Sequence, residues 1–284
     1  MDAEKITATT PLVSIIIPCY NHGQYIDDAL QSVTAITDKS IYEVIIVNDG
    51  STDEFTNRHL ESLSDRYNVI TQPNAGLSAA RNTAIRNARG KYIMPLDADN
   101  KIREGYITHG VHIMESDPSI SVVYGNAQHF GDENKLRKLH DFNLQKLMLS
   151  NFIDSCAIYR KSMWEDIGGY DTNMRDGFED WEFWLNAAFH GHKFQYVDEI
   201  LFDYRVLDTS MVHELNRQKV KVNRIIAYLL EKHPYFYGAQ YLDENIMQKF
   251  SRNPIGFIGL LILKKWFPAR FSKMVVKGRL RKYI

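Results

Sequence analysis

YIMPLDADN, residues 92–100, combines the start of a buried strand with an acidic end. Its apolar residues are followed by Asp97 and Asp99, two carboxylates that repel each other unless a cation or a hydrogen-bond network compensates them. Their hard oxygen atoms suit Mg²⁺ or Mn²⁺, which would in turn be shared with a diphosphate. A pair of turn-capping aspartates on a solvated loop is the alternative, and a short Asp-x-Asp motif alone does not decide between the two.

Strands and helices alternate on the N-terminal side of this stretch. Apolar runs at residues 12–18 and 42–47 predict buried strands, and a shorter one follows at residues 67–71. Amphipathic or cap-forming segments lie between them, with a second helix expected to begin near residues 51–53 and a third to end at Gly90. This alternation predicts an α/β fold: a Rossmann-like, mostly parallel sheet built from right-handed βαβ units, with helices on both faces.

Polar clusters follow three of the predicted strands. PCYN comes after the first strand, NDGS after the second, and DAD after the fourth. Turn residues commonly end strands, so each cluster alone has a structural explanation. In parallel sheets, however, the ligand crevice lies beyond the carboxyl ends of the strands. Three clusters at one edge therefore favour a binding site.

Individual side chains in these regions allow two interpretations each. Arg81 is a fixed cation able to contact phosphate oxygens, or else an ordinary surface arginine. Asp49 can accept hydrogen bonds from a base or ribose, or it closes an Asx-turn. Glu179 and Asp180 begin a predicted helix, where carboxylates are favoured by the helix dipole; one of them is alternatively a general base for an acceptor hydroxyl.

Composition excludes several classes of protein. The 284 residues are 44% hydrophobic with a formal net charge of -1, without the basic footprint that nucleic-acid binding requires. Cys19 and Cys156 lack metal-type spacing and fit a reducing compartment. The N-terminus lacks the pattern of a signal peptide, and the apolar run at residues 255–263 is shorter than the roughly 20 residues of a spanning helix. We therefore expect a cytoplasmic protein.

The ordered motifs VSIIIPCYN, VIIVNDGSTD, NAGLSAARN, YIMPLDADN, GGYD and EDWEFWL resemble those of inverting family 2 glycosyltransferases of GT-A fold, of the kind that build bacterial polysaccharides and glycoconjugates. The resemblance spans about residues 13–211. It implies a nucleotide-sugar donor, with UDP as the expected nucleotide, bound through Mn²⁺ or Mg²⁺. It also implies transfer with inversion to a hydroxyl of a glycan or lipid-linked acceptor.

The resemblance assigns a role to each matching residue. Pro18, Tyr20 and Asp49 would line the nucleoside pocket, with Arg81 near the base or phosphates. Arg205, in YRVLDTSM, would lie in a stretch that closes over the diphosphate.

The acidic residues take the remaining roles that the resemblance implies. Asp97 would lie near the ribose or metal, and Asp99 would ligate the metal directly. Asp180 would be the catalytic base, with Glu179 near the acceptor.

One position departs from the family pattern. Many relatives have a histidine where this chain has Leu207, so a contact to the phosphates or metal is either missing or supplied by His213. An ordinary exposed helix histidine is the preferred interpretation of His213.

The C-terminal part differs from the rest in composition. We place a domain boundary between residues 1–211, the catalytic domain, and residues 212–284, a helical extension. After Glu244 the chain has no acidic residue, and its end combines apolar side chains with a basic cluster made of Lys264, Lys265, Arg270, Lys273, Lys277, Arg279, Arg281 and Lys282. Such a segment can lie in the interface of an anionic membrane. Packing on the catalytic domain and an oligomer contact are the alternatives.

Two other functions compete with glycosyl transfer. A nucleotidyltransferase also holds a metal-bound triphosphate with paired aspartates, but no Gly-rich, lysine-bearing phosphate loop follows the first strand. A binding subunit without catalytic activity would keep the nucleotide pocket, yet Asp97, Asp99 and Asp180 are all present. The sequence leaves the sugar, the acceptor and the oligomeric state open.

Overall fold

The computed structural model describes residues 10–36, 38–207 and 219–234, together with residues 255, 256, 259, 262, 263, 266, 267 and 270. Contacts divide the chain into two compact units, Met1–Ile225 and Ile226–Ile284. The boundary predicted at residues 211/212 lies outside the described residues and remains a prediction.

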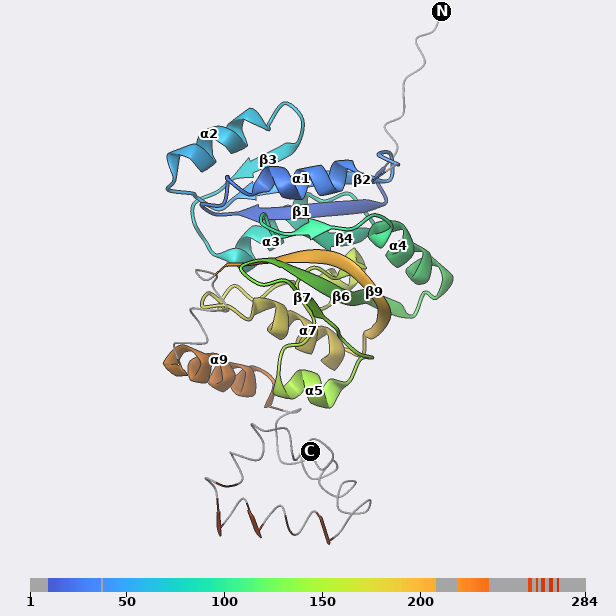
Figure 1. Ribbon diagram of the computed structural model, residues 1–284, viewed down its shortest axis with the longest axis vertical. Helices are drawn as coiled ribbons and strands as arrows, with labels where there is room; N and C mark the ends of the chain where they lie inside the picture. Colours follow the sequence, from blue (N-terminus) through green and yellow to red (C-terminus); the bar gives the residue numbers. More distant parts are fainter. Residues whose placement is uncertain are drawn as a thin grey trace, which may run out of the picture. The chain divides into compact units, whose positions relative to one another are not determined.

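The first half of the sheet is parallel, as the sequence predicts. Its strands lie in the order β3-β2-β1-β4 (Figure 1). Their bounds are β1 Val13–Cys19, β2 Tyr42–Asn48, β3 Asn68–Thr71 and β4 Tyr92–Pro95. The helices between them are α1 Ile26–Thr34, α2 Glu54–Ser62 and α3 Leu77–Asn87.

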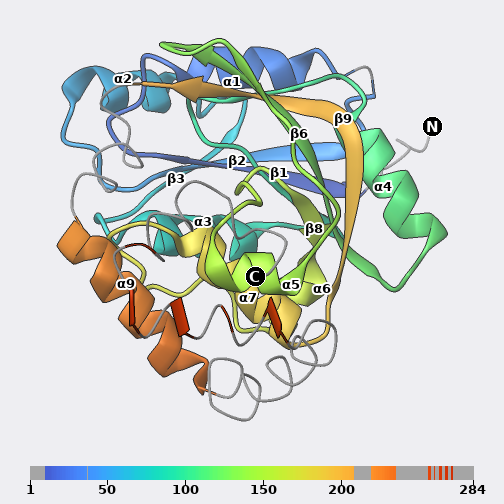
Figure 2. The same ribbon diagram turned by 60° about the horizontal axis from the view of Figure 1, so that its bottom comes forward.

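The second half of the sheet is mixed and continues from β4 in the order β8-β6-β9-β5, with β7 paired to β6. The long strands β6 and β9 run parallel to each other, whereas β8 pairs antiparallel with both β4 and β6. These strands are β5 Lys101–Ile102, β6 Ile120–Gly131, β7 Lys135–Arg137, β8 Ile158–Arg160 and β9 Lys193–Val206. The remaining helices are α4 Tyr106–Ser116, α5 Leu144–Leu149, α6 Lys161–Asp166, α7 Glu179–Phe189 and α9 Lys219–Lys232. Figure 2 shows the curl of β6 and β9.

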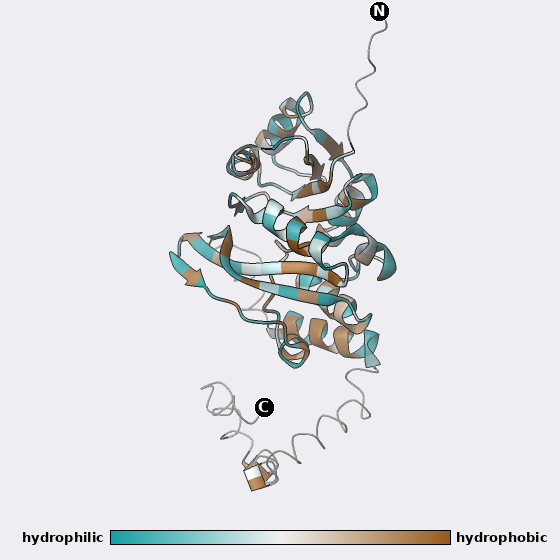
Figure 3. Ribbon diagram, turned by 90° about the vertical axis from the view of Figure 1, so that its right-hand side faces the viewer, coloured by the Kyte–Doolittle hydropathy of each residue, from teal (hydrophilic) through white to brown (hydrophobic). Residues whose placement is uncertain are grey.

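Burial explains the central position of β1. All seven of its residues are buried, because β2 and β4 flank it and helices cover the sheet. Helix α1 buries the residues of the predicted stripe, namely Ile26, Ala29, Leu30 and Val33. Figure 3 shows both apolar and hydrophilic residues on the helices, as expected for helices with one buried and one solvated face.

Of the two helix ends predicted from capping residues, the structure confirms the start of α2 but not the end of α3. Asp53 caps α2 by accepting a hydrogen bond from the backbone amide of Thr56 at 2.8 Å, as predicted. The prediction that Gly90 ends α3 was wrong, because that helix ends at Asn87. Gly90 instead allows close packing against β1: a Cβ atom there would lie 2.5 Å from the backbone nitrogen of Ser14. Among the described helices, none is long and apolar enough to cross a membrane.

Candidate active site

The three polar clusters meet at the carboxyl edge of the parallel strands, as predicted. The register of β1 pairs Cys19 with Asn48 and Ile16 with Pro95, so the segments that follow these strands leave the sheet together. The first two clusters are joined directly, since the backbone amide of Asn21 donates to Ser51 Oγ at 3.0 Å. The fold therefore brings Tyr20, Asp49 and Asp97 to the same edge of the sheet, at the carboxyl ends of the parallel strands.

Arg81 connects two acidic groups beneath this edge. Its Nη2 donates to Asp97 Oδ1 at 2.7 Å, and its Nη1 donates to Glu179 Oε1 at 2.5 Å. Its side chain is only 1% exposed, and its guanidinium lies 5.4 Å from the centre of the Tyr170 ring. Burial opposes the charge, but Asp97 and Glu179 outweigh it and raise the pKa of Arg81, which therefore stays cationic. Arg81 thus holds two carboxylates, an arrangement that its predicted role near the base or phosphates does not include.

Asp97 and Asp99 differ in their surroundings. Asp97 is compensated by Arg81 and also accepts a hydrogen bond from Ser155 Oγ at 3.2 Å. Asp99 pairs with no lysine or arginine side chain in the described part of the chain; His22 Nδ1 lies 4.0 Å from its Oδ2. Burial, followed by the charge of Asp97, raises the pKa of Asp99 to about 7. Of the two aspartates, Asp99 is therefore the one whose negative charge has no lysine or arginine ion-pair partner among the described residues.

The residues present fit a divalent cation that is shared with a ligand. Within the described residues there is no group of three or more His, Cys, Asp or Glu side chains that could hold a metal alone. Mg²⁺ is commonly held by one or two carboxylates together with phosphate oxygens of the substrate. Asp99, with Asp97 beside it, supplies that protein share.

Asp180 lies at the start of α7, near two other acidic residues, Glu179 and Asp154. Asn151 Nδ2 donates to its Oδ2 at 2.8 Å, and the backbone amide of Trp181 donates to its Oδ1 at 2.8 Å. The residue before the helix, Phe178, has a left-handed backbone (φ 57°), an unfavourable conformation for a side chain of this size. Burial, followed by the charges of Glu179 and Asp154, raises the pKa of Asp180 to about 7. A carboxylate with this pKa suits proton transfer near neutral pH.

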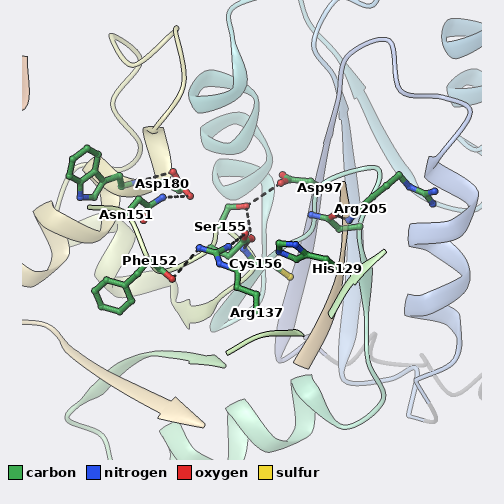
Figure 4. A network of polar contacts seen from close by, with 12 residues as sticks. Asp97, His129, Arg137, Asn151, Phe152, Ser155, Cys156, Asp180 and Arg205 are labelled. Carbon is green, nitrogen blue, oxygen red and sulfur yellow. Dashed lines mark hydrogen bonds and ion pairs between the residues drawn. The ribbon is translucent and has the colours of Figure 1, made fainter. Parts of the chain in front are cut away.

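The segment 151–156 links Asp180 with Asp97 (Figure 4). Its first residue donates to Asp180, and Ser155 donates to Asp97. Arg137 of β7 fixes the middle of the segment by donating to the carbonyl oxygen of Phe152 and to Asp154 Oδ2, both at 3.3 Å.

Asp49 is fully engaged with the turn before α3. Its carboxylate accepts hydrogen bonds from Gln72 Nε2 at 2.7 Å and from the backbone amides of Ala75 and Gly76, both at 2.9 Å. Asp49 is 3% exposed, whereas Tyr20 is 45% exposed. Pro18 is buried within β1. Their assignment to a nucleoside pocket stays a prediction.

Arg205 lies at the end of β9 and contacts the segment after β4. Its Nε donates to the carbonyl oxygen of Asp99 at 3.0 Å, and its Nη2 pairs with Asp28. The guanidinium also lies 4.8 Å from the ring centre of Tyr25 and 4.4 Å from that of Phe130. Leu207 is the last described residue of this stretch, and His213 lies outside the described residues.

Several residues of the site escaped the sequence analysis, namely His22, Arg137, Asn151, Asp154 and Ser155. Most of them lie in or beside NFIDSC, which has no strand or helix periodicity and no motif of known chemistry. His22 follows the first polar cluster directly, so an extension of PCYN by one residue would have included it.

Comparison with known proteins identifies the family. The model of glycosyl transferase family 2 matches residues 14–173, more than half of the chain. A glycosyltransferase of Rickettsia prowazekii without assigned function is 30% identical over 77% of this chain and 70% of its own length. One from Haemophilus influenzae is also 30% identical, over 78% of this chain and 75% of that protein. Chondroitin synthase of Pasteurella multocida is 28% identical over 74% of this chain but only 22% of its own length.

Solved structures confirm the fold. A crystal structure of S. aureus TarS with UDP-GlcNAc superposes with a TM-score of 0.59 at 19% identity, covering 70% of this chain and 60% of that one. The mannosyltransferase PcManGT of Pyrobaculum calidifontis, with GDP-Man and Mn²⁺, gives a TM-score of 0.53 at 20% identity, covering 72% and 60%. Both likenesses show the α/β architecture of GT-A glycosyltransferases. The chain is therefore an enzyme of glycosyl transferase family 2 with the GT-A fold.

Proposed function

We propose that this enzyme transfers a sugar from a nucleoside diphosphate sugar to a hydroxyl of a glycan or lipid-linked acceptor, with inversion at the anomeric carbon. The acceptor oxygen attacks from the face opposite the nucleotide while Asp180 takes its proton. The bond from the anomeric carbon to the diphosphate oxygen breaks, and the nucleoside diphosphate leaves. The observation that carries this proposal is the half-buried carboxylate of Asp180 at the start of α7, which is held by the neutral donors of Asn151 and Trp181 and has its pKa raised to about 7.

Asp180 suits the role of base better than its neighbour. Glu179 is held by the guanidinium of Arg81 at 2.5 Å, so its carboxylate is already engaged in an ion pair. Asp180 has no such cation within hydrogen-bond distance in the described part of the chain; its partners are the neutral donors of Asn151 and Trp181. In this proposal Glu179 positions the start of α7, and Asp180 carries the proton.

The donor diphosphate binds beside Asp99. A divalent cation held there with Asp97 would neutralise charge on the departing diphosphate. Arg81 holds Asp97 through an ion pair. Asp49 orders the turn at residues 72–76 by accepting its backbone amides, and in this proposal that turn contacts the nucleoside. Arg205 donates to the backbone carbonyl of Asp99, and in this proposal it serves as a further cation for the leaving group.

The donor and acceptor classes rest on the similar proteins. The structures that resemble this chain contain UDP-GlcNAc in TarS and GDP-Man with Mn²⁺ in PcManGT. UDP is the nucleotide that we expect here. The relatives named chondroitin synthase and hyaluronan synthase support a glycan acceptor, although this chain covers only 22% of each.

We further propose that the C-terminal segment binds an anionic membrane surface, which would place the enzyme on the inner face of the cell membrane. Ile255, Ile262 and Trp266 recur at helical spacing and are 86%, 51% and 69% exposed. The basic cluster surrounds Trp266 and continues to the end of the sequence. Apolar side chains with flanking cations fit the interface of an anionic bilayer.

Nucleotide release provides the direct test of the reaction. The protein is incubated with UDP-sugars and GDP-mannose, with Mn²⁺ and a panel of p-nitrophenyl glycosides, and the released nucleotide is measured. The anomeric configuration of the product is then read by NMR. Inverted configuration is expected; retained configuration, or equal nucleotide release by Asp180→Asn, would contradict the proposal.

A further inference from the structure

The two ends of the Asn151 side chain have different partners. Nδ2 donates to Asp180 Oδ2 at 2.8 Å. Because an ionised carboxylate only accepts hydrogen bonds, the end of the amide that faces Asp180 is its NH₂ group. The carbonyl oxygen Oδ1 is buried and receives no hydrogen bond from any residue that the structure describes. A buried acceptor without a donor costs free energy, which a ligand with a hydroxyl group would recover.

The segment 151–156 holds this amide in place. Arg137 donates to the carbonyl oxygen of Phe152, the next residue, whose ring is largely buried against Tyr124 and His140. Further along, the backbone amide of Cys156 donates to Asp154 Oδ1 at 3.0 Å. Asn151 is thus fixed both through its own bond to Asp180 and through its neighbour. A preorganised group of this kind loses little entropy when it binds a substrate.

We propose that Asn151 belongs to the acceptor site, where Nδ2 positions the carboxylate of Asp180 and Oδ1 accepts a hydrogen bond from an acceptor hydroxyl. The inference rests on the proposed role of Asp180. Because one amide group contacts both the base and the substrate, the hydroxyl bound to Oδ1 is the neighbour of the one that attacks. The substrate class is therefore a sugar with a vicinal diol, in which one hydroxyl faces Asp180 and the adjacent one faces Asn151.

Several charged groups act on Asp180 together with Asn151. Glu179 of the same helix and Asp154 of the segment 151–156 oppose its ionisation, whereas Arg81 of α3 favours it. The hydrogen bond from Asn151 also favours the ionised form. Loss of this bond should therefore shift the titration of Asp180 to higher pH while the other groups remain.

A double-mutant cycle tests the bond to Asp180 without any substrate. Asn151→Ala, Asp180→Asn and the double variant are unfolded by urea at pH 5.5 and pH 8.5. Alone, Asn151→Ala should lower the urea midpoint more at pH 8.5, where Asp180 is ionised. In the Asp180→Asn background its effect should be equal at both pH values. Equal effects of Asn151→Ala in both backgrounds would overturn the proposal. Ser150→Ala, at the exposed neighbouring position, is the matched control.

Kinetics test the bond to the acceptor. With p-nitrophenyl glycosides as acceptors, Asn151→Ala should raise KM for the acceptor about tenfold, as expected for the loss of one hydrogen bond. The acid limb of its pH profile should move up by about one pH unit, while calorimetric binding of UDP with Mn²⁺ stays unchanged. Acceptors that lack the hydroxyl adjacent to the attacking one should be equally poor for the wild type and the variant.

Failure of this inference differs from failure of the proposed function. If Asp180→Asn is inactive but Asn151→Ala keeps the wild-type acceptor KM and pH profile, only the role of Asn151 is wrong. If Asp180→Asn remains active, the base itself is misassigned. A uniform loss of kcat without a change in acceptor KM or in the pH profile would indicate a structural role and overturn the inference.

Discussion

Arg81 and Glu179 are 98 residues apart in the sequence and form a buried ion pair at 2.5 Å. The same guanidinium also holds Asp97, so one side chain of α3 ties the end of β4 to the start of α7. These two segments carry the proposed metal ligands and the proposed base. Arg81 thereby links the segment of the proposed metal ligands to the segment of the proposed base.

Removal of this cation should destabilise the protein strongly. Arg81→Met leaves the buried carboxylate of Glu179 and the partly exposed carboxylate of Asp97 without their partner, and breaking a buried ion pair typically costs about 3–5 kcal/mol. Urea unfolding measures the loss. Arg86→Met, on the exposed face of the same helix, is the control and should cost less than about 1 kcal/mol. Similar midpoints for the two variants would show that the triad does not hold the site together.

Asp180→Asn should abolish transfer and leave the donor site intact. The amide has nearly the same shape but cannot take a proton from the acceptor hydroxyl. Nucleotide release should fall at least about 100-fold, while calorimetric binding of UDP with Mn²⁺ should not change. Asp65→Asn, at an exposed site, serves as the control. Turnover close to that of the wild type would refute the assignment of the base.

Activity should rise with pH through the neutral range. The pKa of Asp180 is raised to about 7, and the carboxylate acts as a base only when it is ionised. We expect kcat/KM for the acceptor to increase up to a plateau above pH 8, with a midpoint near 7. A profile that is flat between pH 5.5 and 8 would speak against Asp180 as the titrating group.

Stability should change with pH in the opposite direction. The native state keeps a proton on Asp180 up to a higher pH than the unfolded chain does, because the unfolded pKa of Asp is about 3.9. This contribution to stability is fully present below about pH 4 and is lost as pH rises through about 7. The difference in urea midpoint between the wild type and Asp180→Asn should therefore vary with pH across that window, in favour of the variant at high pH.

The two aspartates after β4 should respond differently to substitution. Asp99→Asn should remove the increase in UDP affinity that Mn²⁺ provides and leave the urea midpoint near that of the wild type. Asp97→Asn should lower the urea midpoint, because it takes a partner from the buried Arg81. Calorimetry with Mn²⁺ and with EDTA distinguishes them. UDP affinity that is identical with and without chelator in the wild type would exclude a metal from donor binding.

The C-terminal segment should govern membrane binding. Removal of the residues after Asn253 should release the protein from vesicles that contain phosphatidylserine, as measured by flotation. Replacement of Lys264, Lys265 and Arg270 by Gln should weaken binding by up to about 3 kcal/mol, because each cation contributes about 1 kcal/mol near an anionic surface. Vesicles of neutral lipid are the control. Equal flotation of the truncated and the full chain would dismiss this role.

The first half of the fold could be predicted because its signals are local. Strand β1 is a run of residues buried on both faces, and α1 shows its apolar stripe within nine residues. The second half gives weaker signals: β8 has three residues, and β6 changes from a buried run to partly exposed residues toward its end. Its pairing with β9 depends on residues about 70 positions apart, which no local pattern specifies.

The sequence names residues of the candidate site but not the contacts between them. The resemblance to family 2 glycosyltransferases named Arg81, Asp97, Glu179 and Asp180, and the structure brings all four together. Which carboxylates Arg81 holds depends on where the fold brings the end of β4 and the start of α7 relative to α3, which no local pattern specifies. The same holds for Asn151, whose role depends on its place in the fold and not on its neighbours in the sequence.

The three hydrogen bonds to Asp49 have a thermodynamic consequence for catalysis. They order the turn at residues 72–76 during folding, before a substrate arrives. Immobilising flexible loops normally subtracts from affinity. In the proposed nucleoside pocket, the conformational entropy of this turn is therefore lost before the donor binds. The binding energy of the nucleobase then remains available to stabilise the transition state of sugar transfer.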